Sequence, residues 1–351
     1  MSRPNFSLMR HLIVVALSLT TAAATAGPFN TVWVFDWMNT KGVTIRAQLL
    51  KVSGNKVVLR GQNGQRYEVD ASVLGSEEQK WVDYFRVRGE VQPWDSSSDS
   101  DKGRELEEAG LQRLLYVRNG KQLPFLLYRP AEEKKNVTAL PLILFLHGLG
   151  GKGNDNWKNY ADAGKAPHVF LEKEFQSHMP AYIVIPQSDE AHTWHTDSTT
   201  IPSEKMLLAV QLLDVLKAGA CPKIDMTRLY VTGPSYGGIG TFEAIGKFPG
   251  KFAAAVPVAC VYDTCVFNSL NTAPVRLFVN DDDPYVYLEQ AYHLDKHFKS
   301  LKADFNLTVF KAKGHNAWTK AYGDLDFLRW LQRQQLKAVV YPSDPGTWLK
   351  K

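Results

Sequence analysis

Two short, uninterrupted apolar runs constrain the fold of this chain most strongly. These are LILFL (142–146) and YIVIP (182–186), which lack the alternation of apolar and polar residues seen in half-exposed strands. A continuous apolar strand has both faces buried, and such strands belong to parallel sheets that helices cover on each side. The sequence therefore predicts an α/β architecture.

Strand-like and helix-like segments alternate along the rest of the chain. Met206, Val210 and Leu213 repeat with the spacing of one helix face. Further strand-like runs are LYVT (229–232), AAAVPV (253–258), VRLFVN (275–280) and FNLTVFKA (305–312). Upstream, RLLYV and FLLYR flank an Asn-Gly turn and predict an antiparallel hairpin. We therefore expect a doubly wound, mostly parallel sheet of about eight strands in residues 111–338.

Composition and charge exclude several classes of protein. The 351 residues are 44% hydrophobic, which is too apolar for a disordered chain. The 41 Lys and Arg against 36 Asp and Glu give a net charge of +5, and no basic run is interleaved with aromatic residues, so no nucleic-acid partner is expected. Three cysteines cannot form a disulfide-dense scaffold.

The N-terminus has the pattern of a secretory signal peptide. Arg3 and Arg10 precede the short apolar run LIVVALSL (12–19), and small residues at 24–26 suit a signal peptidase. A membrane anchor is the alternative, but the stretch becomes rich in Thr and Ala after the apolar run, and a span needs about 20 apolar residues. We expect cleavage after residues 1–26, secretion or a periplasmic location, and no membrane span in the mature protein.

Residues 27–94 have the pattern of a small β-module. VTIRAQL (43–49) alternates apolar and polar residues, and turn signals separate it from two further short strands. The order of these strands, with a short helix after them, resembles the SH3-like barrel of the SLA1 homology domain 1 type over about residues 30–86. The module contains no evident nucleophile or metal cluster. We expect it to be a packing or interaction appendage with a protein or cell-wall partner.

A polar stretch at residues 95–110 separates this module from the expected sheet. It begins DSSSDSDKGRELEE and shows no apolar periodicity, which is typical of a linker. Its spaced Asp residues do not form a calcium loop, because no Gly occupies the sixth position of the series. The chain then continues as the 111–338 unit and a C-terminal tail, 339–351.

A G-x-S-x-G motif lies between a predicted strand and a predicted helix. Gly233-Pro234-Ser235-Tyr236-Gly237 follows LYVT, which is the context of a nucleophile elbow. In such a turn the strained backbone needs neighbours without a Cβ two residues before and after the serine. Ser235 is therefore the predicted nucleophile.

A serine needs a base, and the base needs an acid that orients it. His315 follows the strand-like run FNLTVFKA, and Asp281, Asp282 and Asp283 follow VRLFVN. Because the carboxyl ends of parallel strands share one edge of a sheet, these side chains can converge on Ser235. Three adjacent aspartates cannot all orient one imidazole, so the residues alone leave the acid open among them.

Backbone N–H groups are the predicted donors to an oxyanion. The run LILFL leads into the glycine-rich segment HGLGGKG, where such sheets carry an oxyanion loop. We expect the N–H groups of Leu149 and Tyr236 to form the hole. The alternative, a phosphate-binding loop, lacks the required Lys-Ser/Thr pair because Asn154 follows Gly153.

These motifs together resemble the α/β-hydrolase superfamily. The segments LILFLHGLGGKGNDNW, VTGPSYGGIGTFEAIGKFPGKFAAAVPVAC and GHNAW are similar to the secreted carboxylesterase and putative peptidase branch, near phospholipase/carboxylesterases, dienelactone hydrolases and polyhydroxybutyrate depolymerases. The resemblance spans about residues 111–337. It implies that Asp283 is the acid, although Val279-Asn280 replaces the His-Gly that usually precedes it.

Other candidates are less specific. Trp194, His195 and Trp318 are predicted to line the substrate pocket, with core packing as the alternative for the tryptophans. Cys260 and Cys265 are five residues apart and are either a disulfide or free thiols, and Cys221 is an alternative partner.

The predicted function is that of an exported serine hydrolase that cleaves a small-molecule or polymer ester through an acyl-enzyme. No metal or organic cofactor is expected. A serine peptidase acting on short peptides is the second prediction, because Ser-Tyr-Gly-Gly also occurs in prolyl-oligopeptidase relatives. A third is a catalytically silent binding protein that uses the N-terminal barrel.

Overall fold

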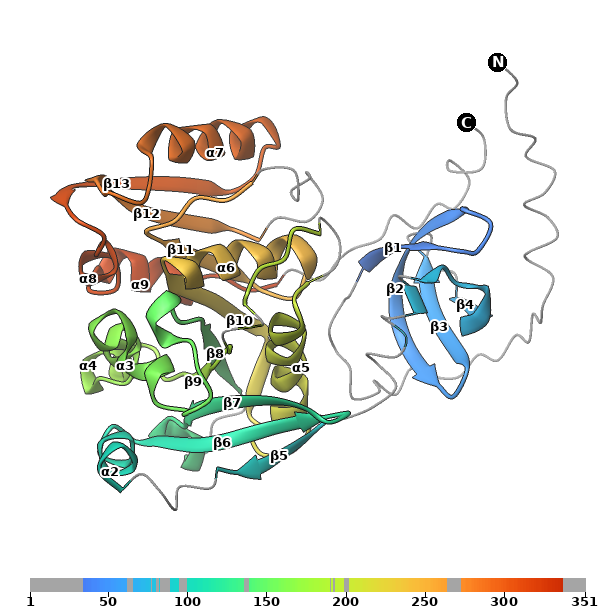
Figure 1. Cartoon of the computed structure of the whole chain (residues 1–351), viewed down its shortest axis with the longest axis horizontal. Helices are drawn as coiled ribbons and strands as arrows, with labels where there is room; N and C mark the ends of the chain where they lie inside the picture. The colour runs from blue at the N-terminus through green and yellow to red at the C-terminus, as the bar shows by residue number, and fades with distance from the viewer. Residues whose placement is uncertain are drawn as a thin grey trace. The chain divides into compact units, whose positions relative to one another are not determined.

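The computed structural model contains two β-sheets, one of four strands and one of nine, among the residues that it describes (Figure 1). Those residues are 34–61, 66–76, 78, 79, 82, 89–94, 100–135, 139–189, 191, 193–198, 202–263 and 273–336. The expected signal peptide, the C-terminal tail and Cys265 lie outside these ranges. No helix within them is both long and apolar enough to cross a membrane.

The first sheet is an antiparallel meander in the order β1-β2-β3-β4. Its strands are β1 (Val34–Met38), β2 (Thr44–Ser53), β3 (Lys56–Gly61) and β4 (Arg66–Asp70), followed by the 3₁₀ turn η2 (Ala71–Val73). Ala47, Leu49, Val57 and Leu59 are buried on one face, as their alternation predicts. Val43, the first residue of the alternating run 43–49, lies just before β2 and is exposed, although the alternation predicts it on the buried face with Ala47 and Leu49. The SH3-like assignment stays a prediction.

The second sheet is the α/β unit that the sequence predicts, in the order β13-β12-β11-β10-β8-β9-β7-β6-β5. Its strands are β5 (Glu90–Pro93), β6 (Leu111–Arg118), β7 (Lys121–Tyr128), β8 (Leu140–Phe145), β9 (Tyr182–Pro186), β10 (Ile224–Pro234), β11 (Ala254–Val258), β12 (Val275–Asp282) and β13 (Phe305–Lys313). Strands β8 to β13 are mutually parallel, and β5, β6 and β7 pair antiparallel at one side.

Helices cover both faces of this sheet. They are α2 (Ser100–Glu108), α3 (Lys158–Lys165), α4 (Lys173–His178), α5 (Glu204–Ala218), α6 (Tyr236–Lys247), α7 (Leu288–Ser300), α8 (Trp318–Ala321) and α9 (Leu325–Gln332). Strand β8 shows the reason: Leu142 and Leu144 pack in the core with α5, α6 and α7, whereas Ile143 and Phe145 pack with the other helices. Such a strand must be apolar throughout.

The hairpin prediction is confirmed. Asn119 and Gly120 both have positive φ, 48° and 74°, between the paired residues Arg118 and Lys121. This is the backbone that a two-residue type I′ turn requires.

The expected module and linker boundaries are wrong at two places. Strand β5 pairs with β6 in the large sheet, so this sheet begins at Glu90 and has nine strands instead of about eight. Residues expected to be a solvated linker form α2, whose Leu106 is fully buried in the core. A single apolar anchor in a charged helix gives no periodic signal, which explains the error.

The order of strands creates a topological switch point beside β8. The chain leaves β8 for β9 on one side, whereas β10 lies on the other side (Figure 1). Ligands of open α/β sheets bind outside the carboxyl ends of the strands at such a point. The segments after β8 and β10 are therefore where a site is expected.

Truncation of Leu106 tests whether α2 is a packed element. We expect Leu106→Ala to lower the free energy of unfolding by about 2–4 kcal/mol, because it leaves a cavity in the core. Glu107→Ala, at an exposed position of the same helix, should change it by less than about 0.5 kcal/mol. Urea unfolding of both variants measures this, and equal effects would mean that α2 is not anchored.

Candidate active site

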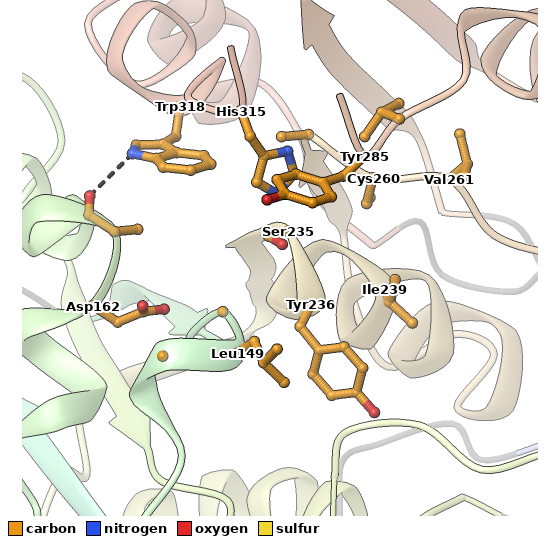
Figure 2. A pocket seen from close by; sticks show the side chains of 15 residues that line it. Leu149, Asp162, Ser235, Tyr236, Ile239, Cys260, Val261, Tyr285, His315 and Trp318 are labelled. Atoms are coloured by element: carbon orange, nitrogen blue, oxygen red, sulfur yellow. Dashed lines mark hydrogen bonds between the residues drawn. The ribbon is translucent and has the colours of Figure 1, made fainter. Parts of the chain in front are cut away.

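A pocket of about 440 Å³ lies at the carboxyl ends of the parallel strands (Figure 2). Segments that follow β8, β10, β11, β12 and β13 all contribute to its wall. The lining residues are Gly148, Leu149, Gly150, Asp162, Ala163, Ser235, Tyr236, Ile239, Ala259, Cys260, Val261, Tyr285, Val286, His315 and Trp318. Residues far apart in the sequence thus meet where the sheet topology predicts a site.

Ser235 sits on a strained turn between β10 and α6. Its φ is +53° and its ψ is −116°, a backbone conformation that residues with a Cβ rarely adopt. The turn is held by hydrogen bonds: the Ser235 N–H donates to Val258 O at 2.8 Å, and Gly238 and Ile239 donate to Ser235 O. The turn directs Ser235 toward the pocket (Figure 2).

The glycines of the motif allow two backbones to touch. A Cβ on Gly233 would lie 2.2 Å from Leu146 O, and one on Gly237 would lie 1.9 Å from the same oxygen. Neither distance is physically acceptable, so the turn can adopt this form only with glycine at both positions. This close approach places Ser235 next to the segment that follows β8.

His315 and Asp283 form a hydrogen-bonded pair at the same pocket. His315 Nδ1 lies 2.8 Å from Oδ2 and 3.0 Å from Oδ1 of Asp283, whose side chain is fully buried. The Tyr285 N–H also donates to Oδ1. Because Nδ1–H donates to this carboxylate, the neutral imidazole has no proton on Nε2, which is left to accept one from a partner in the pocket (Figure 2).

The neighbouring aspartates do not contact the imidazole. Asp281 forms an ion pair with Lys311 at 2.9 Å and accepts a hydrogen bond from the Ala312 N–H. The hydrogen bond with Lys311 lowers the pKa of Asp281. Asp282 is exposed. Of the three candidates, only Asp283 is positioned by the structure to orient His315.

Two ring contacts and two hydrogen bonds position the imidazole and the turn that carries it. The rings of Tyr285 and Trp318 lie edge-on to His315, with centroids 5.0 and 5.6 Å away. The buried Asn280 amide donates to Gly314 O at 2.7 Å and to the Asn316 side chain at 3.0 Å, which braces the turn on both sides of His315.

The two expected oxyanion donors both border the pocket. Leu149 opens the 3₁₀ turn η4 (Leu149–Gly151), and Tyr236 is the first residue of α6. The first N–H groups of a helix have no acceptor within it, so these two remain available for a ligand oxygen. The geometry is consistent with the expected role.

A neutral histidine, His147, precedes the glycine-rich loop after β8. His147 is buried, which lowers its pKa to about 4. Its Nε2 accepts a hydrogen bond from the Ser188 N–H at 3.0 Å, so Nδ1 carries the proton and donates to Gly148 O. The residue before the loop is therefore fixed in one tautomer.

Two of the three expected pocket residues lie elsewhere. Trp194 is fully buried, donates to His147 O and packs against Gly240. His195 contacts the buried Glu243 carboxylate at 3.3 Å. Both side chains tie the loop after β9 to the structure beneath the site. Trp318 does line the pocket.

Of the two alternatives left open for the cysteines, the described residues show free thiols. Cys260 is a free, buried thiol that lines the pocket, and burial raises its pKa well above the usual value. Cys221 is also free, and burial raises its pKa to about 12. Cys265 lies outside the described residues. Both described thiols are thus held in the protonated, unreactive form.

Sequence reasoning missed Asp162, whose carboxylate reaches the pocket from α3. No motif surrounds it, and its position depends on a local backbone kink that the sequence does not signal. Ile239 and Tyr285 were also missed, although Ile239 lies one helical turn after Ser235 and Tyr285 lies two residues after Asp283.

The comparisons with known proteins agree with the fold. The profile of the Prolyl oligopeptidase family matches residues 210–276, which include the elbow. The structure of a thermostable esterase is 25% identical, with a TM-score of 0.56, and the match covers 64% of this chain and 63% of that one.

Other structural matches are weaker. The acylaminoacyl peptidase of Pyrococcus horikoshii is 15% identical with a TM-score of 0.48, over 88% of this chain and 50% of that one. The S-formylglutathione hydrolase of Staphylococcus aureus is 13% identical with a TM-score of 0.46, over 63% of this chain and 97% of that one. The chain thus spans less than two thirds of the esterase and of the peptidase. No curated protein sequence matches significantly.

The buried state of His147 predicts a dependence of stability on pH. The histidine takes up a proton near pH 6.5 when unfolded but only near pH 4 when folded, so protonation favours unfolding. The free energy of unfolding that depends on neutral His147 is fully present above pH 6.5. It falls by up to about 3 kcal/mol as the pH decreases toward 4. Urea unfolding at several pH values should show this loss, and His147→Asn should reduce it. An unchanged slope in the variant would contradict the assignment.

The sheet order, the elbow and the esterase match together identify the chain as an α/β-hydrolase fold protein whose likenesses lie among esterases and the prolyl oligopeptidase family.

Proposed function

We propose that the protein is a serine hydrolase that cleaves carboxylic esters through an acyl-enzyme. The observation that carries the proposal is the His315–Asp283 hydrogen bond at the pocket that also holds Ser235 in its strained conformation. Nucleophile, base and acid are the three roles that acyl transfer by serine requires.

In the first half of the reaction, Ser235 Oγ attacks the ester carbonyl while His315 Nε2 takes its proton. Asp283 stabilises the imidazolium that results. The N–H groups of Leu149 and Tyr236 donate to the oxygen that becomes negative. The C–O bond to the alcohol then breaks, and His315 returns its proton to the leaving oxygen.

In the second half, water takes the place of the alcohol. His315 removes a proton from the water as it attacks the acyl-enzyme, and the bond to Ser235 Oγ breaks in turn. The acid leaves and the serine recovers its proton. No step needs a metal or an organic cofactor.

A peptidase is the second candidate, and one observation favours it. The matched family is named for a peptidase, and the match covers the nucleophile and its helix. The same residues would act on an amide, with His315 protonating the amine as it leaves. Rates on short peptide amides that exceed those on simple esters would favour this candidate.

Export and a partner for the N-terminal sheet are further parts of the proposal. The signal-peptide pattern of residues 1–26 supports a secreted or periplasmic enzyme. The antiparallel four-stranded sheet and the SH3-like sequence pattern of residues 27–94 support a module that binds a protein or cell-wall partner.

Replacement of Ser235 tests the mechanism. We expect Ser235→Ala to lower kcat for p-nitrophenyl butyrate by about 10⁴- to 10⁶-fold with an unchanged urea midpoint. Labelling with a fluorophosphonate probe should be lost in the same variant. Wild-type protein that neither turns over the ester nor takes up the probe would indicate the silent binding protein instead.

The adjacent aspartates provide a matched pair of variants. Asp283→Asn removes the carboxylate that orients His315 and should lower kcat by about 10⁴-fold. Asp281→Asn removes a carboxylate that pairs with Lys311 and should change kcat less than about threefold. Equal losses in the two variants would remove Asp283 from the mechanism.

If the protein is exported, signal-peptide cleavage should give the mature protein one defined N-terminus. Protein recovered from the medium or the periplasm should begin at Gly27 by N-terminal sequencing and intact mass. Ala26→Arg should block cleavage, because the signal peptidase needs a small residue there. Full-length wild-type protein in the cytoplasm would contradict export.

A further inference from the structure

Asp162 is the only carboxylate among the described residues that line the pocket. Most of the remaining wall is apolar or backbone, from side chains such as Leu149, Ile239 and Val286. Figure 2 shows the Asp162 carboxylate pointing into the space beside Leu149, across from Trp318. The proposed mechanism does not use this group, so its presence needs a separate explanation.

The carboxylate is incompletely satisfied. Its Oδ2 is buried and accepts no hydrogen bond from any described residue. The Gly148 and Ala163 N–H groups lie near enough to favour the charged form, but burial has the larger effect and raises the pKa of Asp162. A buried oxygen without a donor costs free energy. Because the residue as a whole is partly exposed and lines the pocket, a cationic donor that approaches from the pocket would stabilise the charged carboxylate.

The backbone that carries Asp162 is strained. Ala163, Gly164 and Lys165 have φ values of 52°, 68° and 61°, three consecutive residues in the left-handed region. Such strain persists only where the surrounding structure holds it, and it is concentrated at functional sites. The Trp318 indole N–H donates to Ala163 O at 3.0 Å and holds this segment against the turn that carries His315 (Figure 2).

The opposite wall is shaped to accept the carboxylate. A Cβ on Gly148 would lie 2.7 Å from Asp162 Oδ2, and one on Gly150 would lie 2.5 Å from Oδ1. Only residues without a side chain leave room for the two oxygens. The carboxylate therefore has a defined position beside the expected oxyanion loop.

From this geometry we propose that Asp162 is a specificity-determining residue that binds a protonated amine of the substrate. The inference rests on the proposed function, because it concerns the same pocket. A primary ammonium supplies three donors and the opposite charge, and the apolar wall accommodates the carbon chain that carries it. The substrate class is thus an ester that bears an ammonium group on a short apolar chain.

A purely structural role is the competing explanation. Through the Gly148 N–H, the carboxylate would orient the oxyanion loop for every substrate alike. The two roles separate in Asp162→Asn, because asparagine keeps an oxygen for that N–H but loses the charge. A structural role predicts equal effects on cationic and neutral esters, whereas amine binding predicts a selective loss.

Isosteric substrate pairs make this comparison. Alanine methyl ester and methyl isobutyrate differ only in an ammonium in place of a methyl group, as do β-alanine methyl ester and methyl butyrate. The measured quantity is kcat/KM for the ammonium ester divided by kcat/KM for the neutral ester of the same pair, determined in a pH-stat at pH 6.5. Any change that affects both esters equally cancels in this ratio. The wild type should prefer the ammonium ester of at least one pair by about tenfold or more.

Asp162→Asn should reduce that preference by about tenfold or more, and Asp281→Asn, a carboxylate outside the pocket, should keep it. The absence of a preference in both pairs would overturn the proposal. An equal loss for the cationic and neutral esters in Asp162→Asn would overturn it in favour of the structural role.

Direct binding separates this inference from the catalytic proposal. Ser235→Ala protein should bind n-butylammonium by calorimetry, and the double variant Ser235→Ala/Asp162→Asn should bind it about tenfold more weakly or not at all. This readout needs no turnover. Butylammonium binding that depends on Asp162 in a protein without esterase activity would support the amine site while the proposed function fails. Equal binding by the two proteins would overturn the amine site.

Discussion

The pocket depends on the contact between two backbones at the end of β8. Leu146 donates its N–H to Thr232 O and presents its carbonyl to the two glycines on either side of Ser235. Since no Cβ fits there, the turn after β10 lies directly against the loop after β8. The proposed nucleophile and the proposed oxyanion loop therefore follow neighbouring strands of one sheet, and the distance between them is set by the strand spacing instead of by flexible side chains.

Structural features that depend on residues close together in the chain could be predicted from the sequence. Continuous apolar runs indicate buried parallel strands, and the elbow motif reports a strained turn because only glycine fits two of its positions. His315 and the group Asp281–Asp283 could be selected because each follows a strand of the same sheet, and the family resemblance implied Asp283 within that group. In each case, the local backbone conformation or the burial of the position restricts which residue types can occur there. The residue type therefore indicates the local structure.

Features that depend on distant partners could not be predicted. The sequence position of Trp194 suggests a pocket residue. In the structure, its buried indole N–H donates to His147 O beneath the site. Asp162 gives no signal, because its place in the wall requires the kink after it and the hydrogen bond between Trp318 and Ala163. That bond links the segment carrying the expected base to the segment carrying the extra carboxylate, so the two sides of the pocket are coupled by residues 155 positions apart.

Strand β5 is the edge strand of the larger sheet, and it precedes α2 in the chain. If residues 90–93 were removed together with the four-stranded sheet, the row of amide and carbonyl groups along β6 would face solvent. An uncovered strand of that kind recruits strands from neighbouring molecules, so a shortened enzyme starting at Leu111 is a candidate for self-association. The natural point of division between the two sheets therefore lies ahead of Glu90.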